Sequence, residues 1–120
     1  MANKNRPTDI RLHQQSRKLE LVYADGVSHQ LSCEFVRVHS PSAEVTGHGP
    51  GQEVLQVGKE DVGIMNIEPI GHYAIKLIFS DGHDTGIYDW NYLFHLGCNQ
   101  AELWENYLQR LAAAGHQRKA

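Results

Sequence analysis

Residues 18–26 read Lys-Leu-Glu-Leu-Val-Tyr-Ala-Asp-Gly, and residues 74–82 read Ala-Ile-Lys-Leu-Ile-Phe-Ser-Asp-Gly. In both stretches the side chains alternate as on a strand with one buried face, before an Asp-Gly pair interrupts the run. Asp-Gly between alternating runs is a strong hairpin signal, and it predicts a type I′ turn whose two central residues have positive φ. The repeated pattern therefore predicts two similar hairpins in one sheet.

Helices are predicted outside these hairpins, at positions marked by polar caps and glycines. A short polar side chain at the N-cap accepts a hydrogen bond from a free backbone N–H, and three residues fit this role: Ser32, Asp89 and Asn99. The predicted helices cover residues 34–38, residues 90–96 before Gly97, and the stretch from Asn99 to Gly115.

Residues 62–67 resume a strand pattern, and residues 68–71, Glu-Pro-Ile-Gly, fit a type I turn. Together these elements predict an α+β fold. We expect a mostly antiparallel β-sheet built from hairpins, with one short helix after the first hairpin and two C-terminal helices packed on one face.

The chain has 120 residues, of which 41% are hydrophobic, enough for one core and too few for two independent domains. Residues 1–17 show no sustained periodicity and are expected to form a flexible basic tail. A single domain is expected over residues 18–115, followed by a short basic tail at residues 116–120.

The formal charge of −3 conceals an uneven distribution. Residues 1–18 carry +4 and residues 116–120 carry +2, which leaves −9 for residues 19–115. The acidic charge of residues 19–115 argues against nucleic-acid binding, because phosphate contacts need a basic face. No apolar run approaches the roughly 18 residues of a membrane span, and the two cysteines, Cys33 and Cys98, give no disulfide pattern. We therefore expect a cytoplasmic protein without nucleic-acid or membrane partners.

No complete catalytic motif occurs in the chain. The glycines fit neither the dinucleotide fingerprint nor the P-loop, and there is no His-Glu-x-x-His and no Gly-x-Ser-x-Gly. The expectation is a protein that is not an enzyme. Polar side chains concentrate in residues 37–52 and 80–90, and the candidate binding surface consists of Arg37, His39, Glu44, His48, Gln52, Asp81, Asp84, Tyr88 and Trp90.

Three segments carry a resemblance to a known family. Residues 37–45 read Arg-Val-His-Ser-Pro-Ser-Ala-Glu-Val, residues 47–52 read Gly-His-Gly-Pro-Gly-Gln, and residues 80–90 read Ser-Asp-Gly-His-Asp-Thr-Gly-Ile-Tyr-Asp-Trp. In order and spacing they resemble the gamma-butyrobetaine-hydroxylase-like N-terminal domain family. That domain is found at the front of oxygenases that use iron and 2-oxoglutarate, attached to P-loop ATPases of iron-sulfur cluster assembly, and alone in small bacterial proteins.

The resemblance also bears on metal binding. In the oxygenases the domain holds a structural zinc through three Cys and one His, and the His position falls on His83. The thiolate positions fall on Ser40, Ser42 and Val45, and neither a Ser hydroxyl nor a Val side chain replaces a thiolate. No cofactor is therefore expected, and the family's zinc is expected to be lost. A different zinc or iron site, formed by His83 with His39, His48 or Cys33, is the alternative.

These observations favour a noncatalytic binding or adaptor domain with a protein partner, linked by the ATPase fusions to iron-sulfur or other metal-cofactor assembly. The partner would be a P-loop ATPase or an assembly scaffold. Two alternatives remain open: an accessory domain that acts with a separate oxygenase, and a small metal-binding protein. The sequence leaves the oligomeric state undecided.

Overall fold

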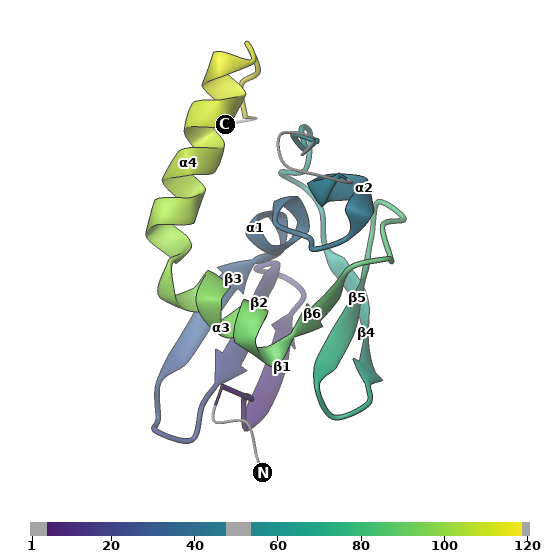
Figure 1. Cartoon of the computed structure of the whole chain (residues 1–120), viewed down its shortest axis with the longest axis vertical. Helices are drawn as coiled ribbons and strands as arrows, with labels where there is room; N and C mark the ends of the chain where they lie inside the picture. Colours follow the sequence, from purple (N-terminus) through teal and green to yellow (C-terminus); the bar gives the residue numbers. More distant parts are fainter. Residues whose placement is uncertain (1–4, 48–53, 119–120) are drawn as a thin grey trace.

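The computed structural model describes residues 5–47 and 54–118, which form two antiparallel sheets and four helices (Figure 1). One sheet contains β1 (Asp9–His13), β2 (Lys18–Val22) and β3 (Ser28–Ser32) in that order. The other contains β4 (Ile64–Ile70), β5 (Ala74–Phe79) and β6 (Ile87–Asp89). The helices are α1 (Cys33–Val38), α2 (Ala43–Thr46), α3 (Trp90–Cys98) and α4 (Gln100–Ala113). The predicted α+β class is confirmed, although the strands divide into two sheets. No helix in the described part of the chain has the length and apolarity to cross a membrane.

Both Asp-Gly hairpins form, and they share one turn geometry. The Tyr23 N–H donates to the Val27 carbonyl at 2.9 Å, and the Gly26 N–H donates to the Tyr23 carbonyl at 3.0 Å. Residues 79–83 repeat these two bonds at 3.0 and 3.1 Å. Gly26 and Gly82 have φ values of 88° and 89°, whereas no described aspartate has a positive φ. The predicted type I′ geometry is therefore wrong, and each hairpin has a three-residue loop that ends in a left-handed glycine.

The segment predicted to be a flexible tail contains a strand. Residues 9–13 form β1, which pairs with β2 and places Leu12 opposite Leu19. Ile10 and Leu12 pack against the core as partly buried side chains. Two apolar side chains in five residues are too weak a periodic signal to distinguish a short edge strand from an irregular segment. The expected flexibility of residues 1–17 is therefore wrong for residues 9–13.

Two predicted chain-breaking positions have other roles. Pro69 lies within the edge strand β4, opposite Ile75, and the turn comes later, at Gly71 with φ 55°. An edge strand tolerates proline because one side of its backbone needs no ladder partner. Gly97 lies within α3, and a Cβ at this position would stand 2.6 Å from the His29 ring. A close approach between helix and strand therefore requires the glycine.

One hydrophobic core joins both sheets to α1 and α3. Its buried side chains include Leu19, Leu21 and Leu31 from the first sheet, Ile64, Leu77 and Phe79 from the second, Phe35 and Val36 from α1, and Leu93 and Leu96 from α3. Burial of a side chain of this size contributes about 1.5–3 kcal/mol. A smaller cluster of Val38, Tyr107 and Leu111 packs α4 against α1, and Figure 1 shows α4 running beside α1 along the long axis of the molecule.

The short helix α1 lies at the centre of this arrangement. Ser32 is its N-cap, as predicted, and the Ser32 hydroxyl accepts from the Phe35 N–H at 3.0 Å. All six residues of α1 are buried, including Glu34 and Arg37. A helix this short is not stable alone and depends on packing. The fold therefore places one acidic and one basic side chain in its interior, where each needs a partner.

The start of α4 differs from the prediction. Asn99 occupies the N-cap position, but its side chain makes no capping hydrogen bond. Its amide instead donates to the carbonyl of His95 at 2.9 Å and so satisfies the end of the preceding helix. A direct junction between α3 and α4 explains the change, because Asn99 ends one helix and begins the next.

We predict that Ser32→Ala costs about 1 kcal/mol of unfolding free energy, the usual value of a lost N-cap. Asn99→Ala should cost clearly less, because water can replace the Asn99 amide at an exposed carbonyl. Urea unfolding of both variants measures the two losses of unfolding free energy, and the m-values should stay equal to that of the wild type. A loss for Asn99→Ala as large as that for Ser32→Ala would contradict the assignment of the two caps.

Candidate functional site

The two polar segments singled out in the sequence meet in space, across the gap between α1 and the β5–β6 turn. The Ser40 hydroxyl lies 2.8 Å from His83 Nε2, and the Ser42 hydroxyl lies 2.7 Å from the Thr85 hydroxyl. Glu44 Oε2 lies 2.9 Å from His83 Nδ1. We call these five residues, Ser40, Ser42, Glu44, His83 and Thr85, the Ser40–His83 cluster.

Local backbone structure places the members of the cluster. Ser42 is the N-cap of α2, where its hydroxyl accepts from the Glu44 N–H at 3.2 Å, so the Glu44 side chain starts in the first turn. On the other side, the Asp81 carboxylate accepts from the His83 N–H at 3.2 Å, within the turn that ends at Gly82. The Ser42–Glu44 part and the His83 part of the cluster are therefore each held by a hydrogen bond within their own segment.

The distances within the cluster are those of a Ser-His-carboxylate triad. Because the Glu44 carboxylate accepts from Nδ1–H, the neutral ring of His83 offers Nε2 as acceptor for the Ser40 hydroxyl. In hydrolases this chain of hydrogen bonds activates an accessible serine, while the carboxylate is held inside. Here the burial is reversed, since Ser40 is only 1% exposed and the Glu44 side chain is 63% exposed.

Packing around Ser40 closes this side of the cluster further. The Ser40 hydroxyl also accepts from the Ser42 N–H at 3.2 Å. A Cβ added to Gly86 would lie 2.5 Å from the same oxygen, so the backbone just before β6 approaches it closely. In this arrangement the hydroxyl holds two chain segments together.

Arg37 and Asp81 form a second connection beside the cluster. Arg37 Nε donates to Asp81 Oδ2 at 2.9 Å, and Lys59 Nζ lies 2.7 Å from the same oxygen. Burial alone would raise the pKa of Asp81, but the Lys59 hydrogen bond, the His83 N–H and the Arg37 charge outweigh it and lower that pKa to about 2. The Arg37 side chain is 7% exposed, and its Nη1 has no hydrogen-bond partner among the described residues. Asp81 thus ties α1 and the loop before β4 to the second hairpin.

Two tyrosines near the cluster, and Trp90 at the opposite end of β5, donate hydrogen bonds to backbone carbonyls. The hydroxyl of Tyr88 donates to the Val36 carbonyl at 2.7 Å, and that of Tyr92 donates to the His39 carbonyl at 2.5 Å. Both hydroxyls therefore satisfy carbonyls at the end of α1, and burial raises the pKa of each. The Trp90 indole donates to the carbonyl of His72 at 2.7 Å. These anchors include Tyr92, which is not among the candidate residues named from the sequence.

The remaining candidates take separate positions. His39 Nδ1 lies 2.9 Å from the Phe35 carbonyl, and burial lowers the pKa of its ring. Asp84 is exposed. His48 and Gln52 lie outside the described residues.

The donor set at the corresponding positions of this chain differs from that of the zinc site that the resemblance implies. The four corresponding positions lie together, since Ser40 contacts His83 and the Val45 N–H donates to the Ser42 carbonyl at 2.9 Å. Their donors are two hydroxyls and one imidazole, which do not fit a zinc site built on thiolates. Among residues 5–47 and 54–118, no three His, Cys, Asp or Glu side chains are grouped so that they could hold a metal ion. At these positions hydrogen bonds join the segment between α1 and α2 to the turn between β5 and β6.

Protonation of His83 should weaken the fold. Burial lowers its pKa, and the charge of Arg37 adds to this effect, although Glu44 and Asp81 oppose it. An unfolded histidine titrates near 6.5, so below that pH the unfolded chain binds more protons than the folded chain. The stabilisation is complete above about pH 6.5 and is lost as the pH falls towards the lowered pKa.

Urea unfolding from pH 8 to pH 5 measures this loss. His83→Gln should show a smaller loss of stability than the wild type over that range, and His39, whose pKa burial also lowers, should contribute to the loss that remains. The exposed His72→Gln is the matched control and should keep the wild-type dependence. An unchanged pH dependence in His83→Gln would contradict the contribution of His83.

Comparisons with known proteins agree with the fold. The family model described as gamma-butyrobetaine hydroxylase-like, N-terminal, matches residues 10–94. No curated protein gives a significant match.

Solved structures give close likenesses. A solution NMR structure is 50% identical, with a TM-score of 0.81 and coverage of 94% of this chain and 89% of that chain. A second NMR structure is 49% identical, with a TM-score of 0.80 and coverage of 98% and 90%. A crystal structure from Acidithiobacillus ferrooxidans, of a protein with unknown function in the DUF971 family, is 38% identical, with a TM-score of 0.67 and coverage of 81% and 98%. The chain therefore belongs to the gamma-butyrobetaine hydroxylase-like N-terminal domain family.

Proposed function

We propose that this chain is a noncatalytic protein-binding module that contacts its partner around the Ser40–His83 cluster. One observation carries the proposal: the buried polar groups of the cluster are engaged with one another, while its carboxylate faces solvent. Glu44 is 63% exposed in its side chain, and Asp84 on the facing turn is exposed. The hydrogen bonds thus hold Glu44 beside the turn that carries Asp84.

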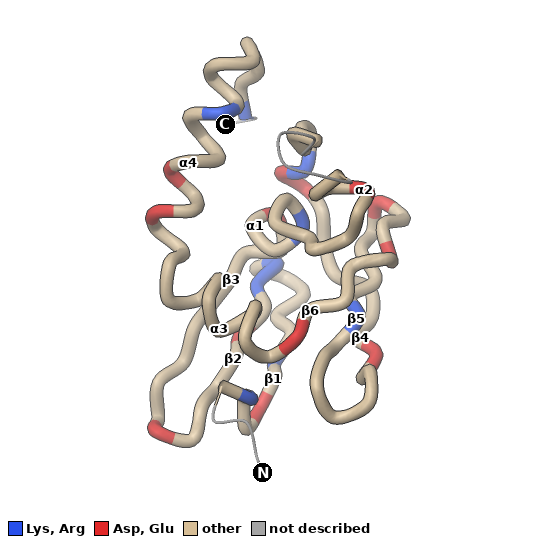
Figure 2. Tube along the Cα trace, viewed as in Figure 1, with Lys and Arg blue, Asp and Glu red and all other residues tan. Residues whose placement is uncertain are grey.

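The charge of this surface indicates the kind of partner. Acidic residues of α2 and of the β5–β6 turn lie near each other (Figure 2), as the contact between Glu44 and His83 requires. Residues 19–115 carry a formal charge of −9. Complementary charge raises association rates and selects partners. A partner with a basic patch fits this surface.

For the biological process, we propose metal-cofactor or iron-sulfur assembly, with a P-loop ATPase or an assembly scaffold as the partner. The support is the occurrence of this domain in fusions with such ATPases. A second candidate is an accessory role beside a 2-oxoglutarate- and iron-dependent oxygenase, and the family's description as hydroxylase-like favours it. Fold kinship alone does not decide between them.

An affinity pull-down from the native cell tests the partner. We expect the wild-type chain to recover a P-loop ATPase or scaffold, and Glu44→Gln/Asp84→Asn to recover much less of it. The double variant Glu102→Gln/Glu105→Gln removes the same charge from exposed positions on α4 and should bind as the wild type does. Recovery of an oxygenase would instead support the second candidate. Equal recovery by both double variants, or no specific partner, would contradict the proposed surface.

Two measurements on the purified, untagged chain test the noncatalytic and metal-free character of the module. A fluorophosphonate probe, which labels activated serines, should leave Ser40 unmodified because the hydroxyl is buried. Elemental analysis should find no stoichiometric zinc or iron. Labelling of Ser40 would indicate a working triad, and a full equivalent of metal would support the alternative of a metal-binding protein.

A further inference from the structure

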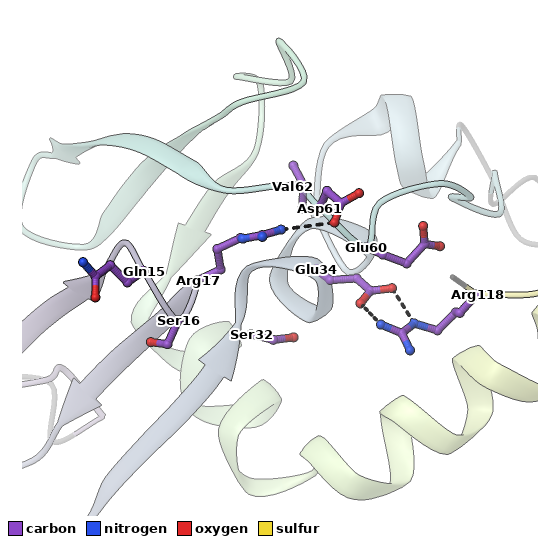
Figure 3. Close-up of a pocket in the computed structure, with 9 residues that line it drawn as sticks. All are labelled: Gln15, Ser16, Arg17, Ser32, Glu34, Glu60, Asp61, Val62 and Arg118. Carbon is purple, nitrogen blue, oxygen red and sulfur yellow. Dashed lines mark hydrogen bonds and ion pairs between the residues drawn. The ribbon is translucent and has the colours of Figure 1, made fainter. Parts of the chain in front are cut away.

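A buried carboxylate on α1 is paired with an arginine from a distant part of the chain. The Glu34 side chain is 7% exposed, and both of its oxygens accept hydrogen bonds from Arg118. Arg118 Nε lies 2.8 Å from Oε2, and the second bond joins Nη2 to Oε1. Figure 3 shows the guanidinium meeting the carboxylate with its two donors side by side. Such a two-point contact is stronger and more specific in geometry than a single hydrogen bond.

An aromatic ring completes the environment of this guanidinium. The central carbon of the Arg118 guanidinium lies 5.1 Å from the centre of the Trp104 ring, within the range of a cation–π contact. Trp104 belongs to α4 and Glu34 to α1, so the Arg118 guanidinium is bound between two helices. Carboxylate and indole together select a flat, charged group.

Open space lies on both sides of the guanidinium. One cavity of about 400 Å³ extends past Glu34 towards Glu60 and Asp61 (Figure 3). A second, of about 470 Å³, extends from Glu34 along Phe35 and Trp104. Both cavities are lined by Ser32, Glu34 and Arg118, and we call them together the Glu34 groove. The groove has room for residues on either side of a bound arginine.

The charges of the groove require a cation at its centre. Three acidic residues line it: Glu34, Glu60 and Asp61. The basic residues among the described lining side chains are Arg118 and Arg17, and Arg17 lies 3.3 Å from Asp61. Without Arg118, the buried Glu34 would lose its counter-charge, which is costly in a protein interior. Arg118 itself lies on a short exposed segment after α4, beyond Gly115 with φ 79°. The acidic groove is therefore built by α1, α4 and the loop before β4, whereas its occupant lies on the exposed segment after α4.

We propose that the Glu34 groove is a binding site for an arginine in a basic segment of a partner protein, and that Arg118 occupies this site in cis until the partner displaces it. Arginine fits better than lysine, because its planar fork matches both carboxylate oxygens and stacks on the indole. The inference stands apart from the proposed function, since it involves none of the residues of the Ser40–His83 cluster.

A synthetic peptide, acetyl-Gly-Ser-Arg-Ser-Gly-amide, tests the site in the full chain by NMR titration. Binding should shift the signals of Trp104 and Ala101, which line the groove. If Arg118 fills the site nine-tenths of the time, Arg118→Ala should bind the peptide roughly tenfold more tightly than the wild type. Replacing the peptide's arginine by neutral citrulline should abolish the shifts, and lysine should weaken them.

Control variants distinguish the site from a general effect of charge. Arg110→Ala removes an exposed arginine of α4 outside the groove and should bind as the wild type does. Adding Glu34→Gln to Arg118→Ala should reduce peptide binding at least tenfold. Equal affinity of wild type and Arg118→Ala, equal binding of the citrulline peptide, or no effect of Glu34→Gln would overturn the proposal.

A wild-type measurement covers the case in which Arg118→Ala does not fold. In the folded chain the Arg118 Nε–H should give a separate NMR signal, because the proton is held by Glu34. The arginine peptide should move this signal to the position of a free guanidinium, and the citrulline peptide should leave it in place. A signal that stays unchanged at saturating arginine peptide would also overturn the proposal.

Discussion

The structure depends on two opposite charges within one buried helix. All of α1 is shielded from solvent, yet it carries Glu34 and Arg37, and an unpaired charge in a protein interior costs several kcal/mol. Arg118 and Asp81 supply the counter-charges, from 84 and 44 residues away. The position of α1 therefore fixes the position of the segment after α4 and of the second hairpin, including the turn that carries part of the Ser40–His83 cluster.

The polar residues of the Ser40–His83 cluster resemble catalytic machinery. A serine, a histidine and a carboxylate in line can activate a nucleophile, but they can also close a seam between two loops. Burial decides between these roles: Ser40 lies inside and Glu44 outside. In this orientation the hydrogen bonds join the segment between α1 and α2 to the turn between β5 and β6. The proposed binding role therefore rests on the exposed Glu44 carboxylate.

Much of the fold follows from local signals in the sequence. Both Asp-Gly hairpins and the Ser32 and Asp89 caps are confirmed, because each depends on neighbouring residues alone. The strand at residues 9–13 was missed because it gains its stability from pairing with β2. Contacts within the candidate site were predictable only as a concentration of polar residues. The pairing of Ser40 with His83, and of Glu34 with Arg118, depends on residues that only the folded chain brings together.

The distances along the chain that these pairs span have a consequence for the order of folding. The hairpins close loops of three residues, whereas the two ion pairs of α1 close loops of 44 and 84 residues. Closing a longer loop costs more entropy, and a six-residue helix cannot nucleate alone. The hairpins can thus form early, while α1 becomes fixed only when distant segments arrive. The Arg118 contact closes the longest of these loops, so the connection proposed to open for a partner is also the one whose formation relies most on the rest of the fold.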